Sequence, residues 1–276
     1  MTKKVLVTGA NGFLGRQLLK SLIQADIEVC VVVRSGLSHS LRDGGFMGEI
    51  IETPDIFLES ADWWVHVFKG VDVVVHSAWY LNPQNYLHSE VNLDCLAGTI
   101  VMAKAAKEAK IKKFVGIGTC LEYDLSEKYL TINTRLSPTT LYGSSKLSAY
   151  LILKSLFSTS NVEFSWCRLF SLFGDGDKES RLAGYIIRQI RDSKRVELTS
   201  GTQIRDYLDV SVAAQKIIDV ALGDKRCAIN ICSGEGISIR QFAEKIALRY
   251  GGLELLYFGA KLDRPDEADC IVGVPN

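Results

Sequence analysis

Short, mainly apolar segments alternate with helical segments along the first two thirds of the chain. The apolar segments are residues 5–7, 29–33, 71–75, 114–117 and 162–169. Strands of a parallel sheet are buried on both faces and therefore read as continuous apolar runs. The segments between them carry helical patterns, at residues 13–25, 57–68, 91–109 and 141–157. This alternation predicts an α/β fold of the Rossmann type, with a doubly wound parallel sheet and right-handed crossovers.

The regular alternation of strand and helix segments ends after residue 170, where a glycine-rich loop begins a less regular region. We predict helices there at residues 182–191, 212–222 and 239–250. Short strands are predicted at residues 195–198, 207–210, 228–232 and 253–258, and the third of these is expected to return to the main sheet. The chain is therefore expected to divide into a large domain, residues 1–170, and a smaller interleaved lobe, mainly residues 171–276.

The composition argues against several classes of protein. The 276 residues carry 32 basic and 32 acidic side chains, so no surplus of positive charge favours nucleic acid or an anionic membrane. No apolar stretch approaches the roughly 20 residues that cross a bilayer, and no signal-peptide pattern is present. Seven scattered cysteines lack a Cys-x-x-Cys pair, and four histidines lack metal-ligand spacing. These features predict a cytoplasmic protein with reduced thiols and no metal site.

A glycine-rich turn connects the first predicted strand to the first predicted helix. Its pattern is Gly-x-x-Gly-x-x-Gly, which differs from the Gly-x-Gly-x-x-Gly dinucleotide fingerprint in the first spacing. Glycines let the backbone approach a pyrophosphate, and the helix amino terminus offers unpaired N–H groups and a positive dipole end. An ordinary strand-to-helix turn is the alternative. The residues predicted to bind a dinucleotide here are Gly9, Asn11, Gly12, Phe13, Leu14 and Gly15.

The end of the second predicted strand bears on the choice of dinucleotide. NAD sites usually carry an acidic residue there that binds the ribose 2′-hydroxyl, whereas an arginine accommodates the 2′-phosphate of NADP. Arg34 occupies this position, so we predict NADP as the preferred cofactor and NAD as the alternative. A solvent-facing arginine with no such task would look the same. Asp55, near the adenine, and Ala78, after a later strand, are also predicted to contact the cofactor.

A tyrosine and a lysine lie four residues apart in a predicted helix, in the segment Tyr142-Gly-Ser-Ser-Lys146. Positions i and i+4 share one face of a helix, so both side chains can point into the same cleft. A neighbouring cation lowers the pKa of a phenol from its usual value of about 10, which would make Tyr142 a proton donor and acceptor at a carbonyl or alcohol carbon. Either motif is common alone, but their combination in this order predicts hydride-transfer chemistry.

Thr119 follows Gly118 at the carboxyl end of a central predicted strand, the edge at which an open α/β sheet binds ligands. Together with the glycine-rich turn, Tyr142 and Lys146, it resembles the extended short-chain dehydrogenase/reductase family of nucleotide-sugar epimerases, dehydratases and reductases. The resemblance covers nearly the whole chain. It extends to Asn92 with Gly98-Thr99, Arg168-Leu-Phe with Phe173-Gly174, Arg205-Asp206-Tyr207 and Arg264-Pro-Asp266.

The resemblance implies a catalytic role for three residues. Tyr142 would exchange a proton with the sugar oxygen, and Thr119 would hydrogen-bond the same oxygen. Lys146 would hold the nicotinamide ribose and lower the pKa of Tyr142, so that both residues contact the cofactor. A Thr119 hydroxyl that bonds only the backbone is the alternative for that residue.

The substrate implied by the resemblance is a nucleoside-diphosphate sugar, bound mainly by the smaller lobe. Arg205 and Arg264 match positions that bind the diphosphate, for which guanidinium groups are suited; surface ion pairing is the alternative for both. Trp79 and Tyr80 follow a predicted strand where a sugar-facing loop is expected, although both could equally be core or rim aromatics. Cys120, directly after the catalytic threonine, completes the predicted substrate contacts.

Two features bear on the reaction. The family's 4,6-dehydratases carry an Asp-Glu pair directly after the catalytic threonine, whereas Cys120 and Leu121 stand here and Glu122 lies one position too far. Arg34 favours an exchanging, phosphorylated cofactor. We therefore predict NAD(P)H-dependent reduction of a 4-keto-6-deoxyhexose, with a 4-epimerase that retains NAD as the alternative and a non-catalytic nucleotide-sensing protein as a third reading. Family members often dimerise through a four-helix bundle, and the apolar positions of two predicted helices permit a homodimer.

Overall fold

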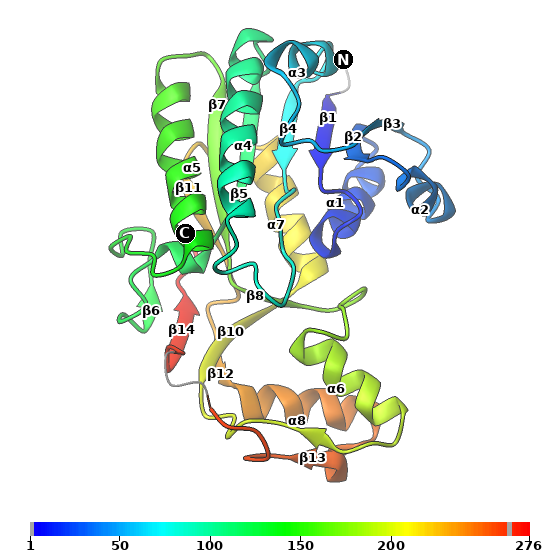
Figure 1. The fold of residues 1–276 in the computed structure, drawn as a ribbon, viewed down its shortest axis with the longest axis vertical. Helices are drawn as coiled ribbons and strands as arrows, with labels where there is room; N and C mark the ends of the chain where they lie inside the picture. The colour runs from blue at the N-terminus through cyan, green and yellow to red at the C-terminus, as the bar shows by residue number, and fades with distance from the viewer. Residues whose placement is uncertain (1–2, 264–266) are drawn as a thin grey trace.

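The computed structural model describes residues 3–263 and 267–276, which form a large α/β part and a smaller part below it in Figure 1. A seven-stranded sheet lies at the centre of the large part. Its strands are β1 (Lys4–Thr8), β2 (Glu28–Arg34), β3 (Glu49–Thr53), β4 (Val73–His76), β5 (Lys113–Thr119), β7 (Glu163–Leu169) and β11 (Ala228–Ile231). Their order is β11-β7-β5-β4-β1-β2-β3, with every neighbouring pair parallel. The predicted doubly wound parallel sheet is confirmed.

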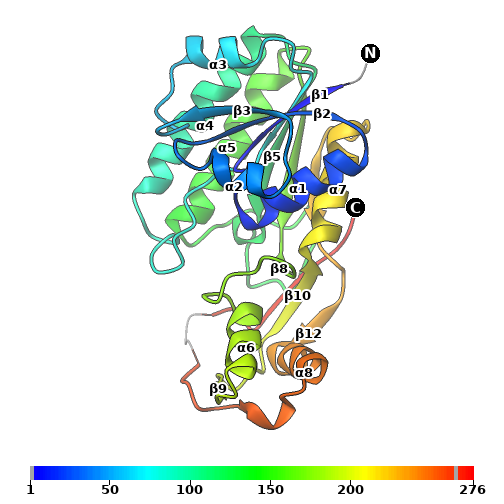
Figure 2. The same ribbon diagram turned by 90° about the vertical axis from the view of Figure 1, so that its right-hand side faces the viewer.

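Helices cover both faces of this sheet, as Figures 1 and 2 show. The helices of the large part are α1 (Phe13–Gln24), α2 (Ser38–Asp43), α3 (Ala61–Val67), α4 (Val91–Glu108), α5 (Leu141–Ser158) and α7 (Val210–Leu222). Helices α1 and α7 pack on one face, while α3, α4 and α5 pack on the other. Neighbouring strand residues point to opposite faces, so Val5 and Val7 join the first layer and Leu6 joins the second. This two-sided burial explains the continuous apolar runs.

The strand order reverses direction between β1 and β4. The chain leaves β1 towards β2 and β3, and it then returns past β1 to form β4, β5 and β7. Ligands of open α/β sheets bind outside the carboxyl ends of the strands at such a reversal. Thr8 and His76 end these two strands, and Thr119 ends β5 beside them. The topology therefore places the candidate site at this edge, facing the smaller part.

The smaller part lies against the carboxyl edge of the main sheet (Figure 2). Its elements are α6 (Leu182–Arg191), β9 (Val196–Glu197), α8 (Ile239–Tyr250), η2 (Leu253–Leu255) and β13 (Leu256–Tyr257). A second sheet links it to the large part through β6 (Tyr129–Leu130), β8 (Ser171–Phe173), β10 (Ile204–Asp209), β12 (Gly236–Ser238) and β14 (Cys270–Gly273). Across the described ranges, no helix has both the length and the apolarity that a membrane span needs.

The differences from the predicted elements have local causes. Strand β3 was not predicted, because the charged Glu49 and Glu52 flank its two isoleucines at the edge of the sheet. The helix predicted at residues 57–68 begins later, at Ala61, because the Ser60 side chain caps it by accepting the Trp63 N–H. The strand predicted at 253–258 is the short helix η2 followed by the two residues of β13. The predicted return of residues 228–232 to the main sheet is confirmed by the pairing of β11 with β7.

Candidate active site

The glycine-rich turn is closely packed, which explains its glycines. Gly9 has a φ of 73°, and a Cβ there would lie 2.7 Å from the backbone nitrogen of Ala78. A Cβ on Gly15 would lie only 2.1 Å from the carbonyl oxygen of Gly9. Gly12 is the N-cap of α1, and no described side chain caps the helix there. The first N–H groups of α1 therefore meet the carboxyl edge of the sheet, an arrangement that suits phosphate groups.

A buried histidine ties the elements around this turn together. His76 at the end of β4 contacts the Thr8 hydroxyl at 2.8 Å through Nδ1 and the Thr99 hydroxyl of α4 at 2.9 Å through Nε2. Burial lowers its pKa to about 3, so the ring is neutral. The Thr8 hydroxyl also accepts the Ala78 N–H at 3.2 Å. Sequence reasoning assigned no role to Thr8 or His76; polar residues at the carboxyl ends of two buried strands were the available signal.

The remaining residues predicted to bind the cofactor lie around the same edge. Asn11 donates through Nδ2 to the Leu37 carbonyl at 3.1 Å, which joins the glycine turn to the loop after β2. Arg34 is exposed at the carboxyl end of β2. The Asp55 carboxylate accepts the Phe57 N–H at 2.9 Å. Of the two residues that open α1, Leu14 is buried in the core and Phe13 lies under the Arg181 guanidinium.

The structure brings together the three residues predicted to be catalytic. Thr119 ends β5, and Tyr142 and Lys146 occupy the first two turns of α5, with exposures of 7%, 8% and 3%. The Thr119 hydroxyl lies close enough to Tyr142 to act on its pKa. A Cβ on Gly143 would lie 2.5 Å from the Leu121 carbonyl oxygen, so this glycine lets α5 approach the end of β5 closely. Residues from two distant segments thus form one cluster.

The Lys146 ammonium is held by a carbonyl and an aromatic ring. Its Nζ donates to the Ile117 carbonyl at 2.7 Å and lies 3.8 Å from the centre of the Trp79 ring. Burial lowers the pKa of Lys146 to about 7. Two protonation states of this residue are therefore accessible at neutral pH.

The expectation that Lys146 lowers the pKa of Tyr142 is wrong for this structure. Burial raises the pKa of Tyr142 above its usual value, and the neighbouring Tyr86 and Glu122 raise it further. The neighbouring Thr119 side chain acts in the opposite direction but is outweighed. Desolvation dominates because the phenol is almost fully enclosed, so Tyr142 remains protonated at neutral pH.

Three of the residues predicted to bind substrate, Trp79, Tyr80 and Cys120, are half-buried. Trp79 donates from its indole N–H to the Asn92 side chain at 2.8 Å, and Tyr80 donates from its hydroxyl to the Asn85 side chain at 2.9 Å. Cys120 is half-buried beside Thr119, and burial raises its pKa to about 12, so it stays a neutral thiol.

The structure describes one of the two arginines predicted to bind the diphosphate. Arg205 on β10 is buried and forms an ion pair with Glu267 at 2.8 Å. Ion pairing was the alternative role for this arginine, although it was expected at the surface. Arg264 lies outside the described residues.

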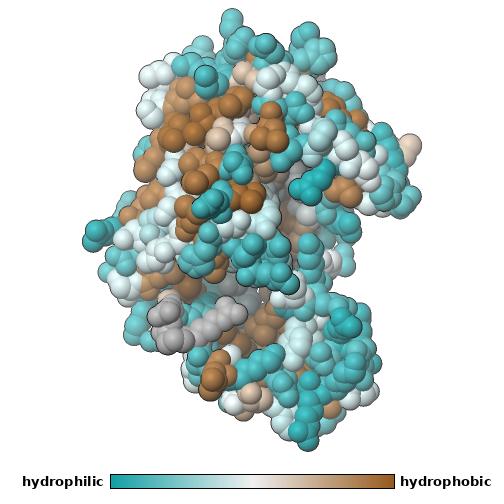
Figure 3. Space-filling view, in the orientation of Figure 1, coloured by the Kyte–Doolittle hydropathy of each residue, from teal (hydrophilic) through white to brown (hydrophobic). Residues whose placement is uncertain are grey.

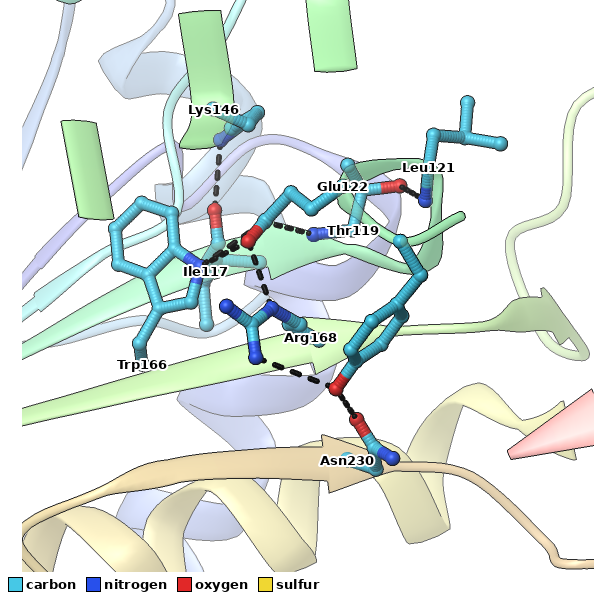
Figure 4. A network of polar contacts seen from close by, with 9 residues as sticks. Ile117, Thr119, Leu121, Glu122, Lys146, Trp166, Arg168 and Asn230 are labelled. Atoms are coloured by element: carbon cyan, nitrogen blue, oxygen red, sulfur yellow. Dashed lines mark hydrogen bonds and ion pairs between the residues drawn. The ribbon is translucent and has the colours of Figure 1, made fainter. Parts of the chain in front are cut away.

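One carboxylate near the candidate site is fully buried. Glu122 in η1 (Cys120–Glu122) is fully buried and forms an ion pair with Arg168 at 2.7 Å (Figure 4). Because its oxygens are occupied by protein donors, Glu122 does not replace the acidic pair that a dehydratase carries after its threonine. Among residues 3–263 and 267–276, no cluster of three or more histidine, cysteine or acidic side chains could hold a metal ion.

Comparisons with known proteins agree with this geometry. A model of the NAD dependent epimerase/dehydratase family matches residues 5–232. The dTDP-6-deoxy-L-talose 4-dehydrogenase (NAD(+)) of Aggregatibacter actinomycetemcomitans is 24% identical over 249 residues, covering 87% of this chain and 88% of that protein. The UDP-glucose 4-epimerase of Streptomyces lividans is 26% identical over 275 residues, covering 89% and 80%.

A solved structure shares the fold. DesIV (dTDP-glucose 4,6-dehydratase) from Streptomyces venezuelae, with NAD bound, has a TM-score of 0.83 at 18% identity and covers 99% of this chain and 88% of that one. The matched family model spans the glycine-rich turn, Thr119, Tyr142 and Lys146. The chain is therefore an enzyme of the NAD dependent epimerase/dehydratase family.

Proposed function

We propose that this enzyme transfers hydride between a nicotinamide dinucleotide and C4 of a nucleoside-diphosphate sugar, and that it acts as a reductase of a 4-keto-6-deoxyhexose. The observation that carries this proposal is the cluster of Thr119, Tyr142 and Lys146 at the carboxyl edge of the sheet, next to the glycine turn. The dinucleotide, when bound, supplies the hydride. Gly9, Gly12 and Gly15 would receive its pyrophosphate, and Lys146 its nicotinamide ribose.

The protonation state of Tyr142 favours the reductive direction. A phenol that burial keeps protonated is a proton donor, and a ketone needs a proton on its oxygen when hydride reaches its carbon. The Thr119 hydroxyl would hydrogen-bond the same oxygen and polarise the carbonyl as charge develops. Arg205 would exchange its Glu267 partner for the substrate diphosphate, and Arg264 is proposed to assist it.

The relatives favour chemistry at C4. The dehydrogenase from A. actinomycetemcomitans is named for oxidoreduction at C4 of a 6-deoxyhexose, and it matches most of this chain. The epimerase from S. lividans supports the second candidate, a 4-epimerase that retains NAD. A nucleotide-sensing protein without activity would have no need of all three catalytic residues, and their presence argues against it.

One experiment separates the two enzymes. The purified protein is denatured, the released nucleotide is identified, and NADPH and NADH are titrated against the native protein. A reductase is expected to carry an empty or exchangeable site and then to oxidise NADPH when supplied with nucleotide 4-keto sugars. Stoichiometric bound NAD and interconversion of 4-epimers without added cofactor would instead support the epimerase. Failure to bind either dinucleotide would refute both.

Arg34 is expected to set a modest preference for NADPH. Its exposed guanidinium suits a 2′-phosphate, but Glu52 on the next strand accepts the Ser38 N–H at 3.0 Å and places a negative charge at the same turn. Replacing Arg34 with serine should lower the NADPH-to-NADH ratio of kcat/KM about tenfold, the effect of losing one exposed charged hydrogen bond. Arg42→Ser in the neighbouring helix is the control. An unchanged ratio in Arg34→Ser would exclude this role.

A homodimer is proposed through the outer faces of α4 and α5. Figure 3 shows apolar side chains gathered on this side of the large part. Leu93, Leu151 and Ile152 are 49%, 51% and 40% exposed. Leu151→Glu should convert the dimer to a monomer in analytical ultracentrifugation, because a charge would be desolvated at the interface. Leu248→Glu, at a leucine of α8 that is even more exposed, should remain dimeric; a monomeric wild-type protein would contradict the proposal.

A further inference from the structure

A buried carboxylate lies directly behind the catalytic threonine. Glu122 is 0% exposed and accepts the backbone N–H of Thr119 at 2.9 Å (Figure 4). It also accepts the indole N–H of Trp166 at 3.0 Å and the Nε–H of Arg168 at 2.7 Å. The Thr119 side chain in turn caps η1, so Thr119 and Glu122 hold each other in a capping box. The position of Thr119 therefore depends on Glu122.

Two glycines in β5 make room for this arrangement. A Cβ on Gly118 would lie 2.4 Å from a Glu122 carboxylate oxygen and 2.2 Å from the Trp166 indole nitrogen. A Cβ on Gly116 would lie 2.4 Å from the Trp166 ring. The glycines in the segment Phe114-Val-Gly-Ile-Gly-Thr119 are thus explained by the side chains packed against the strand, since no turn occurs there.

Arg168, the ion-pair partner of Glu122, is also buried and held by several contacts. Arg168 on β7 is 1% exposed, and its Nη1 donates to the Tyr123 hydroxyl at 3.2 Å. The Tyr123 hydroxyl donates to the Asn230 side chain at 2.7 Å. The guanidinium also lies over the rings of Tyr123 and Tyr150, at 4.8 and 4.7 Å. Arg168 neutralises Glu122 from the side away from the catalytic cluster.

The Lys146 ammonium faces few other charges. His76 on β4 and Cys95 on α4 both act on it, but burial lowers the pKa of His76 to about 3 and raises that of Cys95 to about 11, so both are neutral near pH 7. Tyr142 on the same helix stays protonated because burial raises its pKa. Among the groups in the described chain that act on Lys146, Glu122 supplies the negative charge, and it opposes the effect of burial.

We propose that Glu122 is the positioning residue of this active site: it fixes Thr119 through the backbone N–H, and its charge favours the ammonium form of Lys146. Arg168 and Trp166 hold Glu122 in place. A buried ion pair alone is weak evidence for stability, because apolar residues of similar volume often replace it without loss. The contact with Thr119 and the charge near Lys146 point to a role in the site. The consequences for turnover rest on the proposed function, whereas the effect on Lys146 does not.

The first test measures Lys146 directly. Lysine labelled with 13C at Cε is incorporated, and the NMR signal of Lys146 is assigned by its loss in Lys146→Arg. In Glu122→Gln, which keeps an acceptor for the Thr119 N–H but removes the charge, the titration midpoint of Lys146 should fall by on the order of one pH unit. Lys113 is the internal control, because burial also lowers its pKa but it lies at the other end of β5. Its midpoint should not move.

A matched variant separates this role from a structural one. Tyr123→Phe removes a hydroxyl from the far end of the same network and should leave the midpoint of Lys146 unchanged. An unmoved Lys146 in folded Glu122→Gln would overturn the proposal. If that variant does not fold because Arg168 is left unpaired, Glu122→Gln combined with Arg168→Gln removes both charges, and a smaller shift in the same direction is expected because the opposing charge of Arg168 is lost as well.

The second test measures the pH profile of turnover. Losing a negative charge lowers the pKa of any neighbouring acid, so the high-pH limb of kcat should move to lower pH in Glu122→Gln, with kcat about tenfold lower and KM for the nucleotide sugar nearly unchanged. A uniform loss of activity with an unmoved limb would indicate a merely structural role. If the wild-type enzyme turns over no nucleotide sugar, the proposed function fails, and the NMR comparison still decides the role of Glu122.

Discussion

Replacing Tyr142 with phenylalanine is expected to reduce turnover about 1000-fold while leaving dinucleotide affinity nearly unchanged. The variant loses the proton donor, and general acid catalysis contributes on the order of 100- to 10,000-fold. The phenyl ring keeps the volume of the residue and its edge-to-face contact with Tyr86, whose ring centre lies 5.1 Å away. Steady-state oxidation of NADPH with a 4-keto sugar measures the first effect, and a fluorescence titration with NADPH measures the second.

Tyr150→Phe provides the matched control for this variant. Tyr150 lies two turns further along α5, is equally buried, and packs against Phe164 and Trp166. Loss of its hydroxyl should leave turnover within about twofold of the wild-type rate, because phenylalanine keeps the ring over which Arg168 lies. Wild-type turnover in Tyr142→Phe would remove Tyr142 from the mechanism.

Gly15→Ala is expected to destabilise the large part and to abolish dinucleotide binding. Alanine gains about 1 kcal/mol in helix propensity over glycine. The added Cβ would lie 2.1 Å from the Gly9 carbonyl oxygen, which belongs to backbone and has no rotamer to change. Overpacking of this kind costs roughly 3 kcal/mol, so the clash outweighs the gain. Thermal unfolding followed by circular dichroism and NADH fluorescence titration measure the two effects.

Gly44→Ala, at the end of α2, is the control for this prediction. A Cβ there would lie 3.4 Å from its nearest neighbour, the Leu41 carbonyl oxygen, which is ordinary contact. Its unfolding temperature and NADH affinity should match those of the wild-type protein. If Gly15→Ala keeps both wild-type stability and wild-type binding, then the glycine turn is not closed as tightly as the structure shows.

Much of the fold could be predicted from the sequence because the apolar pattern of each strand is a local feature. Strands buried on both faces are mainly apolar along their length, and the runs around Val5–Val7 therefore mark the sheet without knowledge of their partners. The geometry of Tyr142 and Lys146 is also local, since four residues make one helical turn. Strand β3 escaped prediction because an edge strand is only partly buried and keeps charges at Glu49 and Glu52.

The properties of the side chains at the site were less predictable. The direction of the pKa shift of Tyr142 was wrong, because it depends on how completely other segments enclose the phenol rather than on the lysine one turn away. Arg205 was expected at a phosphate, and its Glu267 partner comes from 62 residues further along the chain. Trp79 proved to pack against Lys146, a contact that no spacing in the sequence indicates.

The sequence by itself determined the parallel sheet, the glycine turn and the catalytic residue types, because each depends on the chemistry of a short segment and its period. Only the tertiary structure decided the environment of those residues. It enclosed Tyr142, placed Lys146 between a carbonyl and an indole ring, and set Glu122 against Arg168 from a strand 46 residues away. Burial and charge act through space, so they depend on contacts between segments that the order of residues does not specify.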